Sequence, residues 1–164
     1  DIGTGSGCIS ACLGKAFPEA EIHAIDSSEQ ALEVAMKNFK ENLIPNVKTV
    51  RIDIMKELPP ANDYDVIVSN PPYIPAEDYR TLDPEVRDFE PAEALTDSGT
   101  GLSFYERFAE IFPGILRPDG RFFLEIGFGQ KESIEKILSN AGYRVETEND
   151  LAGIPRTIFS LTVT

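Results

Sequence analysis

The sequence has 164 residues, of which 41% are hydrophobic and 26% are charged. This length and composition fit one globular domain with an adequate core. Its 15 basic and 28 acidic residues give a net charge of −13. That charge disfavours nucleic-acid binding by the chain alone, because such binding needs clustered Lys and Arg. No apolar run reaches the roughly 18–20 residues that span a bilayer. We therefore expect no membrane contact and, with two cysteines and no disulfide, a cytoplasmic setting.

Alternating strand-like and helix-like segments predict a parallel α/β sheet. Strands are expected at residues 21–26, 47–53 and 65–69, the last of them apolar enough to be central. A helix between the first two strands has Ser27 and Ser28 as candidate N-caps. Its apolar face is expected to consist of Leu32, Met36, Phe39 and Leu43.

The second half of the chain begins with a long irregular segment, residues 70–100, rich in Pro, Asp and Glu. A segment of this length in a compact domain is expected to be functional or disordered. Beyond it, the pattern predicts a helix from about 102, a turn at 118–120, a strand at 121–126 and a helix at 130–141 that Gly142 closes at C′. Strands at 143–148 and 157–163 are expected to pair as an antiparallel edge hairpin, because no long helix separates them.

A glycine-rich loop opens the chain, with Gly3, Gly5 and Gly7 before a helical run over residues 8–17. Cys8 and Cys12 are expected to be buried on one face of that helix. The glycine spacing departs from the dinucleotide fingerprint and so disfavours NAD. The loop fits S-adenosylmethionine (SAM), whose ammonium group an acid such as Asp1 can attract. The remaining candidate SAM-binding residues of the loop are Thr4 and Ser6.

Acidic residues end the next two predicted strands, at the edge where open α/β sheets bind ligands. Asp26 is positioned to accept hydrogen bonds from both ribose hydroxyls, with Ser27 beside it. Asp53 is a candidate acceptor for the adenine amino group, with Ile54 against the ring. Each carboxylate alone would be an ordinary strand end or helix cap, but the combination predicts a SAM site.

The sequence Asn70-Pro71-Pro72-Tyr73 follows the third predicted strand directly. Its prolines stiffen the loop and remove two backbone donors, which leaves the Asn70 side-chain oxygen and the Pro71 carbonyl as acceptors. Tyr73 offers a flat face to a planar amide or base. Two acceptors on an NH2 group would orient its lone pair and favour the positive charge that develops on nitrogen. We therefore identify Asn70, Pro71 and Tyr73 as candidate catalytic residues, and all four residues as a substrate site for N-methylation.

Read together, these residues closely resemble the HemK/PrmC family of glutamine N5-methyltransferases, which act on peptide chain release factors. The resemblance covers nearly the whole chain and extends to residues 89–95, 101–102, Tyr105, Glu125, Gly127 and Gln130. It implies a Rossmann-like class I SAM-dependent methyltransferase sheet with an antiparallel C-terminal edge hairpin. It also implies SAM at residues 1–7, Asp26 and Ile54, and a glutamine amide held by Asn70 and the Pro71 carbonyl. The release factor would be the protein partner.

The same resemblance indicates what this chain lacks. Residues 1–164 are expected to be a methyltransferase catalytic domain whose first strand is largely missing and whose N-terminal helical domain is absent. We expect that domain to contribute to recognition of the release factor.

Three other functions are compatible with parts of the pattern. An N6-adenine or other nucleic-acid amino methyltransferase shares the Asn-Pro-Pro-Tyr chemistry, but the net charge of −13 argues against it. A SAM-binding module without turnover is disfavoured by the intact Asn70. A dinucleotide oxidoreductase is the least compatible. Outside these motifs, Arg156 is expected to be an exposed loop residue, and no metal site is expected.

Overall fold

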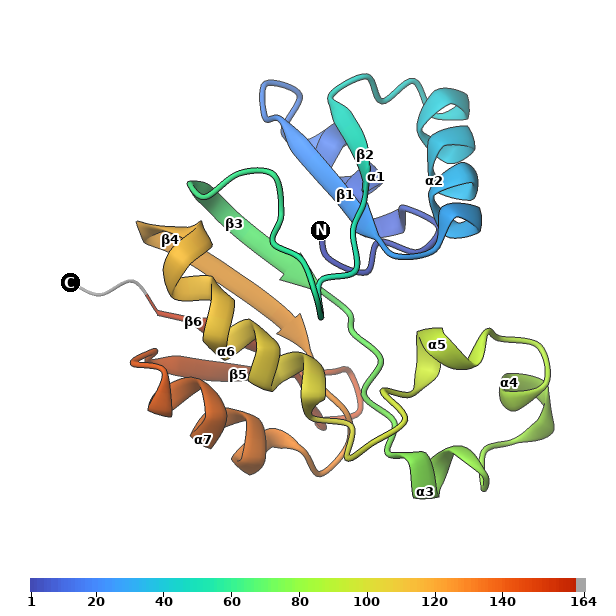
Figure 1. The fold of residues 1–164 in the computed structure, drawn as a ribbon, viewed down its shortest axis with the longest axis vertical. Helices are drawn as coiled ribbons and strands as arrows, with labels where there is room; N and C mark the ends of the chain where they lie inside the picture. The colour runs from blue at the N-terminus through green and yellow to red at the C-terminus, as the bar shows by residue number, and fades with distance from the viewer. Residues whose placement is uncertain (162–164) are drawn as a thin grey trace. The chain divides into compact units, whose positions relative to one another are not determined.

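The computed structural model describes residues 1–161. They form two compact units, one of residues 1–60 and one that begins at residue 61 (Figure 1). Each unit has its own strands and helices, and each is described by itself below. Within residues 1–161, none of the helices combines the length and the apolar character that a membrane crossing requires.

The first unit contains two parallel strands and two helices. In chain order these are α1 (Cys8–Ala16), β1 (Ile22–Asp26), α2 (Glu29–Glu41) and β2 (Val47–Arg51). Strand β1 pairs with β2 from Ile22↔Val47 to Asp26↔Arg51. A small core of Ala24, Ala35, Phe39 and Ile44 holds the helices against the strands, with Ala11 and Val47 packed on it.

Helix α2 begins as the sequence predicts but ends earlier. Ser28 is its N-cap, and the Ser28 hydroxyl accepts a hydrogen bond from the Ala31 amide. Leu32 and Phe39 are buried, as predicted, together with Ala35. The predictions for Met36 and Leu43 are wrong, since both are exposed. The helix ends at Glu41 and Leu43 has a positive φ of 56°, so Leu43 is not on the buried face.

The cysteine prediction also needs correction. Cys8 and Cys12 lie on α1 and are free thiols, as expected, but both are exposed. The face of α1 that is buried carries Ser10 and Gly14 instead. Gly14 is required there, because a Cβ atom would lie 2.5 Å from Ile44 Cγ2.

The second unit contains a four-stranded sheet in the order β3-β4-β6-β5. Its strands are β3 (Tyr64–Ser69), β4 (Leu116–Glu125), β5 (Val145–Asn149) and β6 (Pro155–Ser160). Strand β3 pairs in parallel with β4, and β6 pairs antiparallel with both β4 and β5. The predicted C-terminal edge hairpin is therefore confirmed. Residues 162–164, which include the end of the last predicted strand, lie outside the described residues.

Two details of this sheet differ from the predictions. Among the described residues, β3 lies at one edge of the sheet rather than in its centre, and Val66 is half exposed. Strand β4 starts before the predicted turn: Leu116 already pairs with Tyr64, and pairing resumes at Arg121↔Val66. Residues 118–120 thus form an irregularity within β4, because Pro118 cannot donate to the ladder.

Helices α6 (Ser103–Ile115) and α7 (Lys131–Asn140) lie in front of the four-stranded sheet in Figure 1. Their apolar faces supply much of the core of this unit, where Phe108 stacks on Phe112 at 5.0 Å between ring centroids. Pro113 lies in the last turn of α6, and the helix ends two residues later. Gly142 follows the C-cap of α7 with φ 91°, as predicted for a C′ glycine.

The segment between β3 and α6 is irregular but folded. It contains three single-turn helices, α3 (Ala76–Tyr79), α4 (Pro84–Arg87) and α5 (Ala92–Leu95). Figure 1 shows these turns set apart from the sheet of the same unit. The two ends of the segment come together, because Ile74 forms an isolated parallel bridge with Thr96.

Candidate functional site

The glycine loop is fixed by backbone hydrogen bonds. The Gly3 and Thr4 amides both donate to the Ile25 carbonyl of β1, at 2.8 and 2.9 Å. Gly3, Gly5 and Gly7 all have positive φ, which a residue with a side chain rarely adopts. At Gly7 a Cβ atom would lie 2.6 Å from the buried Phe39 ring, whereas at Gly5 nothing lies within 4 Å. The loop therefore turns tightly at Gly7 and leaves room around Gly5.

Asp1 is held by the loop that it begins. Its Oδ2 atom accepts hydrogen bonds from the Thr4 hydroxyl at 2.7 Å and from the Ser10 hydroxyl and amide at 2.7 and 3.1 Å. The other carboxylate oxygen, Oδ1, is buried and is the one such side-chain atom within the described residues that has no hydrogen-bond partner. A buried carboxylate oxygen without a donor is costly, so Oδ1 is an atom whose burial a hydrogen-bond donor would stabilise.

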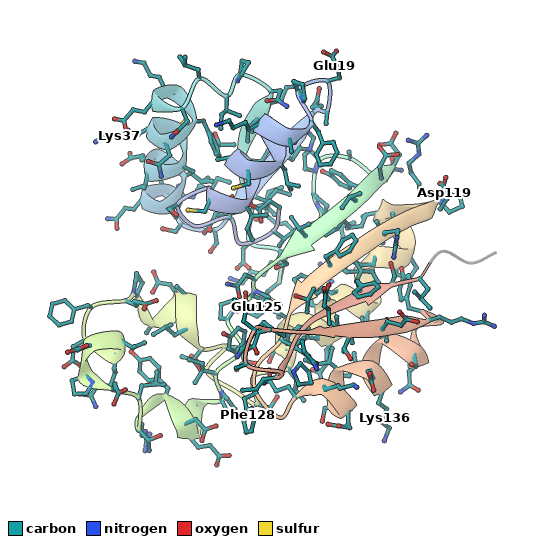
Figure 2. All side chains as sticks on the ribbon, turned by 180° about the vertical axis from the view of Figure 1, so that it is seen from behind. Glu19, Lys37, Asp119, Glu125, Phe128 and Lys136 are labelled. Carbon is teal, nitrogen blue, oxygen red and sulfur yellow. The ribbon has the colours of Figure 1, made fainter. Side chains whose placement is uncertain are left out.

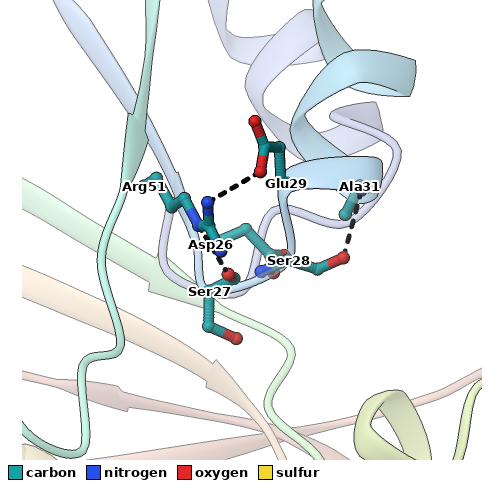
Figure 3. A network of polar contacts seen from close by, with 6 residues as sticks. All are labelled: Asp26, Ser27, Ser28, Glu29, Ala31 and Arg51. Atoms are coloured by element: carbon teal, nitrogen blue, oxygen red, sulfur yellow. Dashed lines mark hydrogen bonds and ion pairs between the residues drawn. The ribbon is translucent and has the colours of Figure 1, made fainter.

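Asp26 lies at the end of β1 and joins the glycine loop to helix α2. One carboxylate oxygen accepts from the Gly5 amide and the other from the Ser28 amide, both at 2.9 Å. Figure 3 shows Asp26 at the start of α2, beside Ser27 and Ser28. Each carboxylate oxygen has a further lone pair, so the side chain is fixed and can still accept additional hydrogen bonds.

The other candidate residues of the first unit are arranged less specifically. The Ser27 side chain is exposed, and its carbonyl accepts from Arg51 at 3.4 Å (Figure 3). The Ser6 carbonyl accepts from the Asn38 side chain at 2.8 Å. Strand β2 ends at Arg51, two residues before the predicted end, and Asp53 lies in the turn that follows. There the Asp53 carboxylate accepts from Met55 and pairs with Lys56 at 2.7 Å.

Lys56 first, and then the Met55 amide, lower the pKa of Asp53 against the opposing effect of burial. Ile54 beside it is buried, with 5% of its surface exposed. The structure thus gives Asp53 a local role in its own turn, and neither supports nor removes the adenine contact expected from the sequence.

In the second unit the Asn-Pro-Pro-Tyr sequence follows β3 directly, as predicted. Asn70 is exposed and Pro71 is buried. The Tyr73 hydroxyl donates to Glu125 Oε1 at 3.1 Å, and Figure 2 labels Glu125 at the end of β4. Burial, followed by the Glu125 carboxylate, raises the pKa of Tyr73, so this hydroxyl keeps its proton at neutral pH. The ring of Tyr73 is thereby tethered to a strand of the sheet.

The backbone of Tyr73 is held by Gln130, which precedes α7. Gln130 Nε2 donates to the Tyr73 carbonyl at 2.9 Å and to the Gly101 carbonyl at 3.3 Å. Its Oε1 accepts from the Gly127 amide at 2.9 Å. Sequence similarity singled out these residues, but only the structure shows that they converge on the loop.

Arg156 is not the exposed loop residue that we expected. It lies in β6, pairs with Asp150 at 3.6 Å between Nε and Oδ2, and donates to the Ile126 carbonyl at 3.2 Å. It also acts on Tyr73, where it opposes the increase in the pKa that burial and Glu125 cause. The strand begins at Pro155, two residues earlier than predicted, and this brings Arg156 into the sheet.

Two further residues were not identified from the sequence. Ser10 holds Asp1 from within α1. Asp97 accepts from the Gly99 and Gly101 amides and from the Ser103 amide and hydroxyl. Burial opposes ionisation of Asp97, but these hydrogen bonds outweigh it and keep the pKa of its carboxyl below the ordinary value. The Asp-Ser-Gly sequence at 97–99 could have signalled a turn, but not its contact with α6.

Among residues 1–161, no three His, Cys, Asp or Glu side chains are placed to hold a metal ion. The groups that the structure offers are carboxylates and backbone amides in the first unit, and oxygen acceptors in the second. The first set suits a polar ligand with hydroxyl and ammonium groups, and the second suits an NH2 group.

Comparison with solved structures identifies the fold. A methyltransferase from Pyrococcus furiosus matches with a TM-score of 0.69 over 97% of this chain and 71% of its own, at 21% identity. The fold is the Rossmann-like α/β fold of the class I methyltransferases, as predicted. Residues 1–101 match the methyltransferase small domain family, and the chain belongs to that family.

Curated relatives are similar over almost the whole of this chain. The release factor glutamine methyltransferase of Bordetella pertussis is 43% identical over 157 residues, which are 95% of this chain and 57% of that protein. That of Fusobacterium nucleatum is 37% identical over 161 residues, 98% of this chain and 46% of that protein. The resemblance found in the sequence is confirmed, and the chain spans about half the length of these relatives.

Proposed function

We propose that this chain is the catalytic domain, residues 1–164, of an enzyme that transfers the methyl group of SAM to the side-chain amide nitrogen (N5) of a glutamine in a peptide chain release factor. The Asn70–Tyr73 loop is the observation that carries the proposal. The loop follows β3, and it offers oxygen acceptors because its two prolines have no backbone amide hydrogen. Its Tyr73 is hydrogen-bonded to Glu125 and Gln130. The names of the relatives from Bordetella pertussis and Fusobacterium nucleatum support the same substrate.

The first unit carries acceptor atoms whose hydrogen-bonding capacity is not filled, and these suit SAM. The buried Asp1 Oδ1, which has no partner in the structure, suits the ammonium group of the methionine part. Asp26, fixed by the Gly5 and Ser28 amides, suits the ribose hydroxyls. Gly3, Thr4, Gly5, Ser6 and Gly7, together with Ser27, Asp53 and Ile54, complete the proposed contacts of this unit, and Asn70 is proposed as a further SAM contact.

When bound, SAM supplies an electrophilic methyl group. The nitrogen of an amide is a poor nucleophile because its lone pair is delocalised, so the chain has to orient it. The Asn70 side-chain oxygen and the Pro71 carbonyl would each accept one hydrogen of the amide. Held in this way, the lone pair is directed out of the amide plane, and the charge that grows on nitrogen is stabilised.

Proton loss needs no strong base before the transition state. The methylated nitrogen is acidic and can release its proton afterwards. Tyr73 would contribute a flat face beside the amide, and Glu125 keeps that ring in one orientation. The tyrosine hydroxyl is not a candidate base, because its raised pKa keeps it protonated.

The partner in this proposal is the release factor, in the cytoplasm, where translation ends. Direct binding of nucleic acid is not part of the proposal, since the chain has 28 acidic and only 15 basic residues. An N6-adenine substrate would use the same loop chemistry. The experiment below must therefore distinguish methylation of adenine from methylation of glutamine.

The test is peptide mapping by mass spectrometry after a release factor is incubated with SAM and enzyme. The 164-residue chain is run beside a form that is extended upstream, each with an Asn70→Ala variant and an Asn62→Ala control. Asn62 is exposed and lies before β3, so its loss should not alter transfer. We expect one added methyl group on one glutamine, lost in Asn70→Ala and kept in Asn62→Ala.

If both forms bind SAM and every glutamine stays unmodified, the release-factor function is wrong. Transfer to DNA or RNA adenine under the same conditions would then favour the nucleic-acid alternative. Activity in the extended form alone would assign part of the substrate recognition to the upstream residues.

A further inference from the structure

Three elements of the second unit meet at the Tyr73 backbone: the turn at Gly101, the turn at Gly127 and the start of α7. Gln130 is the side chain that joins them. Its Nε2 atom lies 2.9 Å from the Tyr73 carbonyl and 3.3 Å from the Gly101 carbonyl, and its Oε1 lies 2.9 Å from the Gly127 amide. One carboxamide therefore satisfies three backbone groups from three separate parts of the chain.

The two glycines at this point are there because the packing is tight. At Gly127 a Cβ atom would lie 2.6 Å from Gln130 Oε1 and 2.9 Å from the Tyr73 ring. At Gly101, where φ is 78°, a Cβ atom would overlap the Tyr73 carbonyl oxygen and would lie 2.7 Å from Gln130 Nε2. The absence of side chains at both positions is what lets Gln130 reach the Tyr73 backbone.

The proline loop has few other fixed points of this kind. Pro71 and Pro72 carry no amide hydrogen, so they cannot anchor the loop as donors. The next anchor along the chain is the Ile74 amide, which donates to the Leu95 carbonyl at 2.9 Å. Going from Pro71 toward Ile74, the Tyr73 carbonyl is therefore the first backbone group that is hydrogen-bonded to a distant element.

We propose that Gln130 is a positioning residue for the Asn70–Tyr73 loop: its carboxamide fixes the Tyr73 carbonyl and so sets the placement of the acceptors at Asn70 and Pro71. Gln130 acts through the Tyr73 backbone and not on the substrate. This inference rests on the proposed function for its effect on turnover, and on the geometry above for its effect on the loop.

Gln130 has a second role that the test must separate from the first. The Gln130 side-chain oxygen accepts from the Gly127 amide, and the Gln130 backbone amide donates to the Gly127 carbonyl at 3.2 Å. The two hydrogen bonds close the turn before α7. A change that removes both contacts would confuse loss of the turn with loss of the loop anchor. The Gln130→Glu variant avoids this, because a carboxylate still accepts from Gly127 but cannot donate to Tyr73.

The experiment compares Gln130→Glu and Gln130→Ala with the unchanged chain. The matched control is Asn140→Asp, the same amide-to-acid change at an exposed position at the end of the same helix. For each protein, kcat on the release factor, the Kd of SAM and the thermal midpoint are measured. Hydrogen exchange is followed at the Gly127 and Ile74 amides.

For Gln130→Glu we expect kcat to fall about 10- to 100-fold, the size of effect that a displacement of about 1 Å produces. The Kd of SAM should stay within about twofold, since Asn70 is the one proposed SAM contact in the loop that Gln130 anchors and the others lie outside that loop. The Gly127 amide should stay protected in Gln130→Glu and lose protection in Gln130→Ala. The Ile74 amide should exchange faster in both variants, and Asn140→Asp should match the unchanged chain in kcat and in exchange at both amides.

A Gln130→Glu protein that keeps full kcat and normal Ile74 exchange would overturn the proposal. A loss of kcat with unchanged Ile74 exchange would also overturn it, because the loop would then not have moved. If neither the unchanged chain nor its upstream-extended form modifies a glutamine, the proposed function fails, while the loop anchor is still decided by the exchange at Ile74. Faster exchange at Ile74 supports the anchor, and unchanged exchange refutes it.

Discussion

The two candidate loops of this chain are built with opposite polarity. In the first unit the loop is rich in glycine, its backbone offers amide donors, and the Asp26 and Asp1 carboxylates hold it. In the second unit the loop is rich in proline, so its backbone offers carbonyl acceptors, and the Gln130 side-chain amide holds it. A donor-rich backbone thus needs acidic side chains, and an acceptor-rich backbone needs a donor.

The difference also concerns stiffness. Glycine lets the chain turn sharply but leaves it flexible, and each of the three loop glycines has positive φ. Several hydrogen bonds, from Gly3, Thr4 and Gly5, compensate for that flexibility. Proline removes most of this freedom in advance, and the loop then depends on a small number of anchors beyond its end.

The largest effect that we expect follows from the tight packing of the proline loop. Gly101→Ala and Gly129→Ala introduce the same methyl group at almost the same backbone angle, φ 78° and 77°. At Gly129 nothing lies within 4 Å, so only the backbone strain of about 1–2 kcal/mol is expected. At Gly101 the methyl group overlaps the Tyr73 carbonyl and adds about 1–3 kcal/mol.

Urea unfolding of the two alanine variants measures this difference. Equal losses of stability in Gly101→Ala and Gly129→Ala would mean that Tyr73 moves away freely, and that the second loop is not closely packed.

The next effect tests the glycine loop. Asp26→Asn keeps the shape of the side chain but removes its charge and replaces one acceptor oxygen by a donor nitrogen that faces a backbone amide, that of Gly5 or Ser28. We expect the affinity for SAM to fall about tenfold or more, equivalent to about 1.4 kcal/mol. Isothermal titration measures it, with Asp63→Asn, an exposed residue outside the loop, as control. An unchanged Kd would remove Asp26 from the proposed site.

Asp97 provides an acidic anchor in the second unit, and its effect depends on pH. The pKa of its carboxyl is lowered in the folded chain, so its stabilising effect is present above the unfolded pKa of about 3.9. The effect is lost as the pH falls through the lower, folded value. At pH 7 we expect Asp97→Asn to reduce stability by about 1 kcal/mol, a value reduced for partial exposure.

The difference between Asp97→Asn and the unchanged chain should be constant from pH 7 to about 4 and should shrink below that range. Chemical unfolding at several pH values follows it, with Asp119→Asn, exposed in the irregular part of β4 at 118–120 (Figure 2), as control. A difference that stays the same at low pH would show that the charge of Asp97 is not what holds the turn.

The smallest effect belongs to the surface pair beside Asp26 in Figure 3. Glu29 accepts from Arg51 at 2.7 Å, but their side chains are 67% and 61% exposed. Such pairs contribute roughly 0.2–1 kcal/mol at most and are screened by salt. Glu29→Gln should therefore lower the free energy of unfolding by less than about 1 kcal/mol. A greater loss, obtained from the thermal midpoint, would show that this pair, and not Asp26 alone, stabilises the start of α2.

Sequence patterns predicted most elements of the fold, because apolar periodicity and turn residues act locally. The N-cap at Ser28, the C′ glycine at Gly142 and the C-terminal hairpin were all predicted in this way. The errors occur where burial depends on distant neighbours. Met36 and the two cysteines are apolar at helical spacing, yet they are exposed because other residues of α2 and α1 face the strands.

The sequence alone determined the residue types of the two loops and the chemical groups that they offer. Glycine keeps an open backbone amide, proline lacks one, and a carboxylate at a strand end accepts hydrogen bonds, whatever surrounds them. The anchors were decided by the tertiary structure. Gln130 lies 57 residues after Tyr73, and Asp26 lies 21 residues after Gly5. A hydrogen bond depends on separation in space, and only the folded sheets and helices bring these groups within 3 Å.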